Sequence, residues 1–169
     1  STLLVLVFSD RTYCAQNLPS SANSNTMIIE SAIIKANLGL GIYYFKDTQN
    51  NVNLEKIYTS KDINWQINPD ETPNFGVDSS NTWFKKSIKF DHQKSDQYLL
   101  EIAYPALDYI DVYIVQNGQI RKAFHTGDRL AFNSRNIEHR NFLFPLPLLE
   151  SDQNVDIYIR AQTAGAMQL

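Results

Sequence analysis

Two alternating segments in the C-terminal half carry the polar side chains best suited to binding a ligand. In residues 108–115, branched aliphatic residues alternate with polar or aromatic ones, namely Tyr109, Asp111 and Tyr113. Because side chains alternate between the two faces of a strand, we expect these three on one face, about 7 Å apart. Phenol rings can stack on a sugar ring while the carboxylate binds its hydroxyl groups. The alternative is a packing layer beneath another part of the protein.

Residues 156–160 (DIYIR) repeat this pattern, with two isoleucines between Asp, Tyr and Arg. If both strands lie in one sheet, Arg160 joins the Tyr and Asp side chains of residues 108–115 on a common face. We therefore predict Arg160 as a further ligand contact. The alternative is cross-strand ion pairing on a solvated face, which contributes little to stability.

A group of charged residues follows Gly127, which suits a turn with positive φ. Asp128 is followed by Arg135 and Arg140, and the planar arginine fork is suited to holding a carboxylate or a ligand oxygen. We interpret Asp128, Arg135 and Arg140 as a polar clamp on a ligand. The alternative is a structural Asp–Arg pair that braces a long loop.

Residues 81–90 (NTWFKKSIKF) also alternate, and Phe84 and Ile88 mark the side that suits the core. Trp83 falls on the opposite side, which we expect to be the wetter one. An exposed indole there would add a stacking surface. Trp83 is therefore predicted as a surface contact for the ligand.

Catalytic motifs are missing from the sequence: there is no GxSxG, P-loop or GxGxxG pattern, and the three histidines lack metal-ligand spacing. A carboxylate pair for glycoside hydrolysis is the remaining enzymatic alternative, with four candidates, Glu101, Asp108, Asp111 and Asp128. Loop carboxylates suggest a weaker calcium alternative at Asp62, Asp70, Glu71 and Asp78. We expect a binding domain with no catalytic residue, no cofactor and no metal.

Length and charge narrow the class of protein. A chain of 169 residues is long enough for one domain with a substantial core. The net charge of −3 and the scattered basic residues do not provide the basic patch that nucleic-acid binding requires, so no nucleic-acid partner is expected. The single cysteine, Cys14, excludes an intrachain disulfide.

The N-terminal segment indicates export. Residues 2–8 (TLLVLVF) are an apolar run too short to span a membrane, and a Ser- and Asn-rich stretch follows. We interpret residues 1–26 as a signal-peptide remnant and linker, and residues 27–169 as a periplasmic sensor domain. The alternative for residues 2–8 is a buried N-terminal strand.

The elements that position the polar residues are short strands separated by turns. Strands are expected at residues 42–47, 81–90, 97–104, 108–115, 119–125, 142–148 and 154–162, with one helical turn at residues 54–58. Asn117-Gly118 predicts a tight hairpin turn, and Pro145 and Pro147 place their strand at an edge or bulge. Without a long amphipathic helix for crossovers, we predict an all-β sandwich or jelly roll.

Several motifs of the chain, in their order, resemble the 7TMR-DISM extracellular domain type 2. The first comprises Asn74, Gly76 and the Trp-Phe-Lys run at residues 83–85. The others lie at residues 105–113 (PALDYIDVY), 127–135 (GDRLAFNSR), 140–146 (RNFLFPL) and 157–165 (IYIRAQTAG). The resemblance covers residues 43–169.

The resemblance implies a jelly-roll domain similar to carbohydrate-binding modules. It also implies that the domain lies outside the inner membrane. In the full-length protein it would be followed by seven transmembrane helices and a cytoplasmic histidine kinase or diguanylate cyclase. We therefore expect a periplasmic domain that senses a carbohydrate or similar small polar ligand. The alternatives are a protein–protein module, acting through a homodimer or a co-receptor ectodomain, and a calcium sensor.

Overall fold

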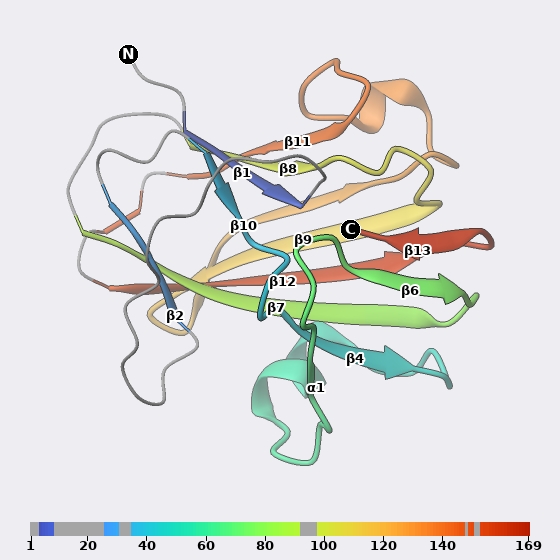
Figure 1. The fold of residues 1–169 in the computed structure, drawn as a ribbon, viewed down its shortest axis with the longest axis horizontal. Coiled ribbons are helices and arrows are strands. Elements are labelled where there is room, and N and C mark those ends of the chain that lie inside the picture. Colours follow the sequence, from blue (N-terminus) through green and yellow to red (C-terminus); the bar gives the residue numbers. More distant parts are fainter. Residues whose placement is uncertain (1–3, 9–25, 31–34, 92–97, 148, 151–152) are drawn as a thin grey trace.

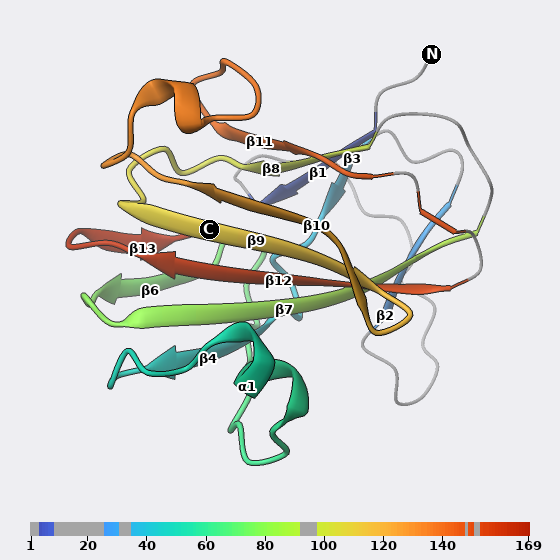
Figure 2. The ribbon, with the colours of Figure 1, turned by 180° about the vertical axis from the view of Figure 1, so that it is seen from behind.

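The computed structural model describes residues 4–8, 26–30, 35–91, 98–147, 149–150 and 153–169. Within these ranges strands dominate, beside the helix α1 (Leu54–Thr59) and the 3-10 turn η1 (Phe132–Ser134). The strands form two main sheets, stacked on one another, and a two-stranded ribbon (Figures 1 and 2). The predicted all-β sandwich is confirmed, and the jelly-roll connectivity stays a prediction.

The larger sheet has the order β10-β9-β12-β7-β4-β5, and β2 pairs with β7. Its strands are β10 (Gln119–Thr126), β9 (Tyr109–Gln116), β12 (Asn154–Gln162), β7 (Asn81–Phe90), β4 (Tyr43–Asp47), β5 (Gln66–Ile67) and β2 (Thr26–Ile29). The smaller sheet comprises, in order, β11 (Phe142–Pro145), β8 (Tyr98–Ile102), β1 (Leu4–Phe8) and β3 (Lys35–Asn37). The ribbon pairs β13 (Ala166–Gln168) with β6 (Asn74–Val77).

The main core lies between the two sheets and follows the predicted alternation. The inward residues of β9 and β12 are fully buried, as expected for Ile110, Val112, Ile114, Ile157 and Ile159. They belong to one cluster with residues of β8 and β11 in the smaller sheet, Leu100, Ile102, Phe142 and Phe144. The rings of Phe124 and Phe144 join the two sheets with their centroids 5.3 Å apart.

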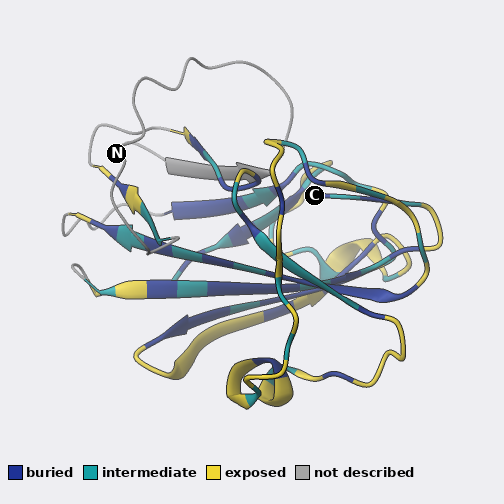
Figure 3. Cartoon of the chain, turned by 60° about the horizontal axis from the view of Figure 1, so that its bottom comes forward, coloured by how far each residue is buried: buried dark blue, intermediate teal, exposed yellow. Residues whose placement is uncertain are grey.

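A second hydrophobic cluster lies on the outer face of the larger sheet, beneath α1. It is formed by Val52, Ile57, Trp83, Val115 and Tyr158. Helix α1 begins after Asn53, whose side chain accepts a hydrogen bond from the Lys56 amide at 2.9 Å, an N-cap. Figure 3 shows α1 exposed on the outer side of mostly buried strands. The helix therefore covers part of the sheet face that the sequence analysis expected to be the wetter one.

The hairpin of β9 and β10 has the predicted turn. Asn117 and Gly118 adopt φ values of 55° and 72°, the left-handed values that a two-residue hairpin turn requires. Strand β11, which contains Pro145, lies at the edge of the smaller sheet, as a missing amide donor requires. Both expectations are confirmed.

The N-terminal apolar run contains strand β1. It pairs in parallel with β8 and with β3 inside the smaller sheet. Residues 4–8 thus form a strand, which was the alternative to a signal-peptide remnant for this segment. Residues 9–25, the rest of the predicted leader and linker, lie outside the described residues. The assignment of residues 1–26 to an export leader stays a prediction.

Candidate functional site

The outward side chains of β9 and β12 meet across the larger sheet. In the antiparallel register Tyr109 pairs with Gln162, Asp111 with Arg160, and Tyr113 with Tyr158. Directly opposed residues on one face of a sheet have side chains within contact range. The common face predicted for the two strands is therefore confirmed.

Asp111 is the centre of this face. It is 5% exposed, although it is a carboxylate. One side-chain oxygen pairs with Nη2 of Arg160 on β12, and the other with Nδ1 of His125, its register partner on β10. A buried carboxylate requires such partners, because an unpaired charge away from water is strongly disfavoured. Three neighbouring strands are thus joined by one charged cluster.

The contact with Asp111 defines the proton position on His125. An ionised carboxylate only accepts hydrogen bonds, so Nδ1 must carry the proton that it donates to Asp111. The other ring nitrogen, Nε2, then presents a lone pair in the neutral imidazole. The His125 side chain is 60% exposed, so this lone pair is accessible to a ligand.

A hollow of about 290 Å³ opens beside this cluster, at the end of the sheet where β10 and β12 finish and β7 and β9 begin. Its lining consists of polar side chains and one phenol, from Asn50, Asn81, Tyr109, His125, Arg160 and Gln162. Two of the eight residues predicted from the sequence, Tyr109 and Arg160, line it. A third, Asp111, holds two of its lining residues in place.

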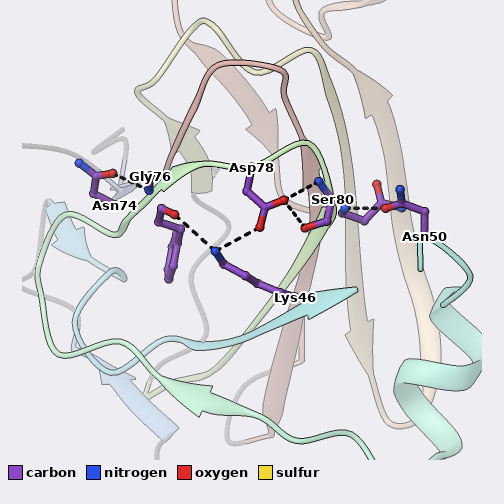
Figure 4. Close-up of polar contacts among 8 residues, drawn as sticks. Lys46, Asn50, Asn74, Gly76, Asp78 and Ser80 are labelled. Carbon is purple, nitrogen blue, oxygen red and sulfur yellow. Dashed lines mark hydrogen bonds and ion pairs between the residues drawn. The ribbon is translucent and has the colours of Figure 1, made fainter. Parts of the chain in front are cut away.

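The amide side of the hollow is built from loops that are tied to each other. Asn50 is in the left-handed conformation with φ 52°, and its side-chain oxygen accepts a hydrogen bond from the backbone amide of Asn81 at 2.7 Å (Figure 4). Gln162 donates through Nε2 to the Ser79 carbonyl at 3.2 Å. Three elements, the loop after β4, the start of β7 and the end of β12, are therefore held in fixed relative positions.

The loop before β7 is itself ordered by Asp78. Its carboxylate accepts hydrogen bonds from the amide and the hydroxyl of Ser80, at 2.9 and 2.8 Å, and pairs with Lys46 Nζ at 3.3 Å (Figure 4). The Ser80 hydrogen bonds, aided by Lys46, hold the pKa of Asp78 below its ordinary value. Asp78 therefore stays ionised and positions the segment that leads to Asn81.

Trp83 is not a surface residue, and the expectation of an exposed indole is wrong. It is 1% exposed in the second cluster, beneath α1. Tyr113 stacks on it, with ring centroids 6.3 Å apart and planes 18° apart. Burial raises the pKa of the Tyr113 phenol, and the charge of Asp111 adds to this effect. Both rings form the packing layer that was the alternative for this face, so of the aromatic residues predicted as contacts only Tyr109 lines the hollow.

The predicted Asp–Arg clamp lies in the loop between β10 and β11, away from the hollow lining. Arg135 donates through Nη1 to the carbonyls of His139 and Arg140 at 2.8 and 2.6 Å, and its guanidinium lies 4.4 Å from the Phe142 ring centroid. Nη2 is 4.0 Å from the carboxylate of Asp128. These are the contacts of the loop-bracing alternative. The side chains of Asp128 and Arg140 are exposed, and neither lines the hollow.

The sequence interpretation missed four residues of the hollow, Asn50, Asn81, His125 and Gln162. For Gln162 a signal was present, since it continues the outward series of Asp156, Tyr158 and Arg160 on β12. Asn50 and Asn81 reach the site through loop positions that no periodicity describes.

The carboxylates of the enzymatic alternative are engaged in structural contacts. Asp108 accepts from the Ala164 amide at 2.8 Å, and Glu101 accepts from Asn141 Nδ2 at 2.6 Å. Among the residues that the structure describes, no group of three or more His, Cys, Asp or Glu side chains is arranged to hold a metal ion.

The described residues thus form a β-sandwich with a polar hollow at one end of the larger sheet. The chain belongs to the 7TMR-DISM extracellular 2 family, whose model matches residues 39–169. It is therefore an extracellular, periplasmic sensor domain of a membrane receptor. The described residues contain no helix that is long and apolar enough to cross a membrane. A search of curated proteins found no match.

Proposed function

We propose that this sensor domain binds a carbohydrate or a similar small polar ligand in the hollow around Asp111. The observation that carries the proposal is the lining itself, which combines three amides, an imidazole, a guanidinium and one partly exposed phenol ring. Pockets for apolar ligands are lined mainly by aliphatic and aromatic side chains. A lining of hydrogen-bonding groups with a single flat ring suits a ligand that carries hydroxyl groups around a ring.

The rigidity of the lining supports binding rather than surface decoration. Arg160 and His125 are both held by Asp111, and Asn50 is held by the Asn81 amide. Groups that are already fixed lose little conformational entropy when a ligand arrives, which favours affinity. Exposed polar residues without such partners would have to be ordered by the ligand.

A route from the hollow to the rest of the receptor is supported by the loop that follows β12. Gln162 ends β12 in the hollow, and the next residues bond to the loop before β9 through Thr163 Oγ1 to Ala106 O at 3.2 Å and through Ala164 N to Asp108. Strand β13 follows directly. We propose that ligand contact with Gln162 shifts this loop and β13, and so controls a cytoplasmic diguanylate cyclase or histidine kinase.

Calorimetry and thermal unfolding with a panel of monosaccharides, disaccharides, polyols and amino acids test the proposal. A ligand of the native state raises the melting temperature. The Tyr109→Ala variant should weaken binding by roughly tenfold, as expected for loss of a stacking ring. Tyr58→Ala, which removes an exposed ring on α1 outside the hollow, is the matched control and should bind normally. If no member of the panel binds, the proposal fails.

A second candidate function is a protein–protein sensing module that acts through dimerisation or a co-receptor. Two large apolar side chains favour it, since Ile120 at the start of β10 and Phe132 in the loop after β10 are more than half exposed. Apolar and aromatic side chains of this kind are enriched at the centre of interfaces. Sedimentation at increasing concentration should then show association that Phe132→Ala reduces. A monomer at all concentrations, with no co-receptor captured, would argue against it.

A further inference from the structure

The hollow is lined by a guanidinium and by no carboxylate, which bears on the class of its ligand and rests on the function proposed above. Its titratable lining residues are Arg160, His125 and the phenol of Tyr109. The nearby carboxylate of Asp111 is not among the lining groups, and Arg160 and His125 each engage one of its oxygens. A ligand in the hollow therefore meets a cation and an imidazole without meeting a free carboxylate.

A hollow selective for neutral sugars would call for a different arrangement. Each sugar hydroxyl is a donor as well as an acceptor, and an exposed carboxylate is the strongest acceptor that a protein offers to it. Here the carboxylate nearest to the ligand is fully committed to protein partners. The chemistry of the lining is thus biased toward donors.

The donors converge from two strands and one loop. Nη2 of Arg160 bonds Asp111, while the rest of its guanidinium fork has no partner within the described residues. Asn50 uses its Oδ1 for the Asn81 amide, so its NH₂ group remains to donate. Asn81 is 7% exposed, yet its side-chain amide makes no hydrogen bond to the described part of the chain. Because Asn81 lines the hollow, this amide is available to a ligand group.

The acceptors suit hydroxyl groups rather than a second charge. In the neutral tautomer whose Nδ1–H donates to Asp111, Nε2 of His125 carries a lone pair that can accept. Gln162 uses its NH₂ group for the Ser79 carbonyl, which leaves Oε1 free to accept. Tyr109 supplies a partly exposed ring at the edge of the hollow. One end of the hollow therefore offers charge-assisted donors, and the remainder offers hydroxyl acceptors and a stacking face.

We propose that the hollow selects a sugar acid, a single sugar ring that carries a carboxylate, over its neutral parent sugar. The carboxylate binds the free edge of the Arg160 guanidinium together with the amides of Asn50 and Asn81. Ring hydroxyls donate to His125 Nε2 and Gln162 Oε1, and the ring face rests on Tyr109. The volume of about 290 Å³ is at the small end of ligand pockets and is enough for one sugar ring.

Matched ligand pairs test this inference by calorimetry on the unmodified chain. Glucuronate is compared with glucose and galacturonate with galactose, with acetate and sulfate as anions that lack the sugar. One member of an acid pair should bind roughly tenfold more tightly than its neutral parent, the ratio expected when a neutral hydrogen bond becomes a charge-assisted one. Acetate and sulfate should bind more weakly than that acid.

Two variants assign the preference to the arginine. Arg160→Gln should remove the preference for the acid while leaving some binding of the neutral parent. The single change leaves the buried Asp111 carboxylate with one partner fewer, so a second variant controls for misfolding. The Asp111→Asn/Arg160→Gln double variant replaces the ion pair with two neutral amides that can hydrogen-bond. It should show the same loss of preference, and circular dichroism checks that it is folded. Arg129→Gln is the control, since Arg129 pairs with Asp108 at 3.4 Å outside the hollow lining and should retain the preference.

The possible outcomes separate this inference from the function on which it rests. Equal binding of acid and parent, or tighter binding of the parent, overturns the sugar-acid preference and leaves a sugar-sensing hollow. Equal binding of acetate, sulfate and sugar acid overturns sugar recognition of any kind. Loss of the preference in Arg129→Gln but not in Arg160→Gln overturns the assignment to the hollow.

Discussion

Gly127 is the residue whose replacement should harm the fold most directly. Its φ is 155°, and a Cβ at this position would lie 2.0 Å from the Asp108 carbonyl oxygen. The next two amides, of Asp128 and Arg129, bond to carbonyls of Leu107 and Asp108, so the two backbone segments cannot separate freely. We predict that Gly127→Ala lowers the free energy of unfolding by at least about 2 kcal/mol in urea denaturation.

Gly165 provides the control for that change. It lies at the same end of the sandwich, but a Cβ there would meet nothing closer than 3.6 Å, and its φ is not positive. Gly165→Ala should therefore stay within about 0.5 kcal/mol of the parent chain. Equal effects of the two substitutions would show that the close approach at Gly127 is not the cause.

Lys86 is a buried cation on the core face of β7. It is 5% exposed and donates through Nζ to the Leu40 carbonyl at 2.7 Å. Burial in surroundings of low polarity lowers the pKa of its ammonium from the ordinary 10.5. The folded protein therefore releases this proton at a lower pH than the unfolded chain does.

The pH dependence of stability follows from that difference. Between the lowered folded pKa and 10.5 the unfolded chain binds more protons at Lys86, so stability rises with pH in this window. Below the window the penalty for the buried charge is fully present. We predict that Lys86→Met is the more stable protein at pH 7, and that the parent approaches it as the pH rises toward 10.5. Urea midpoints measured from pH 7 to 10.5 test this, with exposed Lys61→Met as the control. A constant difference across that range would contradict it.

Trp83 shows what alternation can and cannot predict for a single residue. The period of two correctly separated Trp83 from Phe84 and Ile88, which are fully buried in the main core. The pattern does not state what covers each face, and here α1 covers the second one. The face on which Trp83 lies was therefore predictable, whereas its exposure depended on the helix at Leu54–Thr59, a separate segment earlier in the sequence.

At the scale of the elements, a β-bulge explains why His125 was not predicted in the site. Next to the turn Ile120 pairs with Val115, but from Lys122 onward the register has moved by one residue. Without this shift His125 would oppose Ile110 instead of Asp111. A one-residue slip exchanges the two faces of a strand. The bulge thus turns Phe124 into the core and His125 toward the hollow. The hairpin turn signal at Asn117-Gly118 does not predict a bulge, so it could not predict which face His125 is on.

The loop between β10 and β11 depends on Arg135 for its order. The side chain is only 9% exposed and joins two backbone carbonyls to the ring of Phe142. Removing a charged donor from such contacts weakens the local structure by about 1.5–3 kcal/mol. We predict that Arg135→Ala increases the rate of chymotrypsin cleavage after exposed Phe132 by roughly tenfold or more.

Arg140→Ala is the matched control for that experiment. The Arg140 side chain is exposed, and Arg135 contacts only its backbone carbonyl, which the substitution keeps. Its cleavage rate should match that of the parent chain. If both variants are cleaved at the same rate, Arg135 does not brace this loop, and its predicted role in ligand binding regains support.

At the scale of the whole molecule, local signals predicted the class of fold but not the assembly of its sheets. Hairpin partners such as β9 and β10 are neighbours in sequence and have a turn signal between them. The pairs β12–β7 and β1–β8 join segments far apart in the chain. The pairs β1–β8 and β2–β7 are parallel. The ribbon of β6 and β13 was missed because Asn74–Val77 lies in a stretch rich in Pro and Gly, without an alternating pattern.

The N-terminal strand is the point at which the whole fold can be tested. Strand β1 lies between β8 and β3, so its removal leaves β3 without its partner and takes from β8 one of its two neighbours. We predict that a chain lacking residues 1–25 unfolds at a lower urea concentration and loses at least about 2 kcal/mol. Such a loss would identify residues 4–8 as part of the folded domain.

The denaturant slope distinguishes this outcome from a merely loosened end. The slope scales with the surface that unfolding exposes, and a sandwich that has lost an interior strand buries less of it. We therefore expect a lower slope together with the lower midpoint. If the shortened chain retains both values, β1 contributes nothing to the sheet, and residues 1–26 are the export leader and linker that the apolar run first indicated. Because residues 39–169 carry the family match, ligand binding by the shortened chain would then place the whole sensor function after the leader.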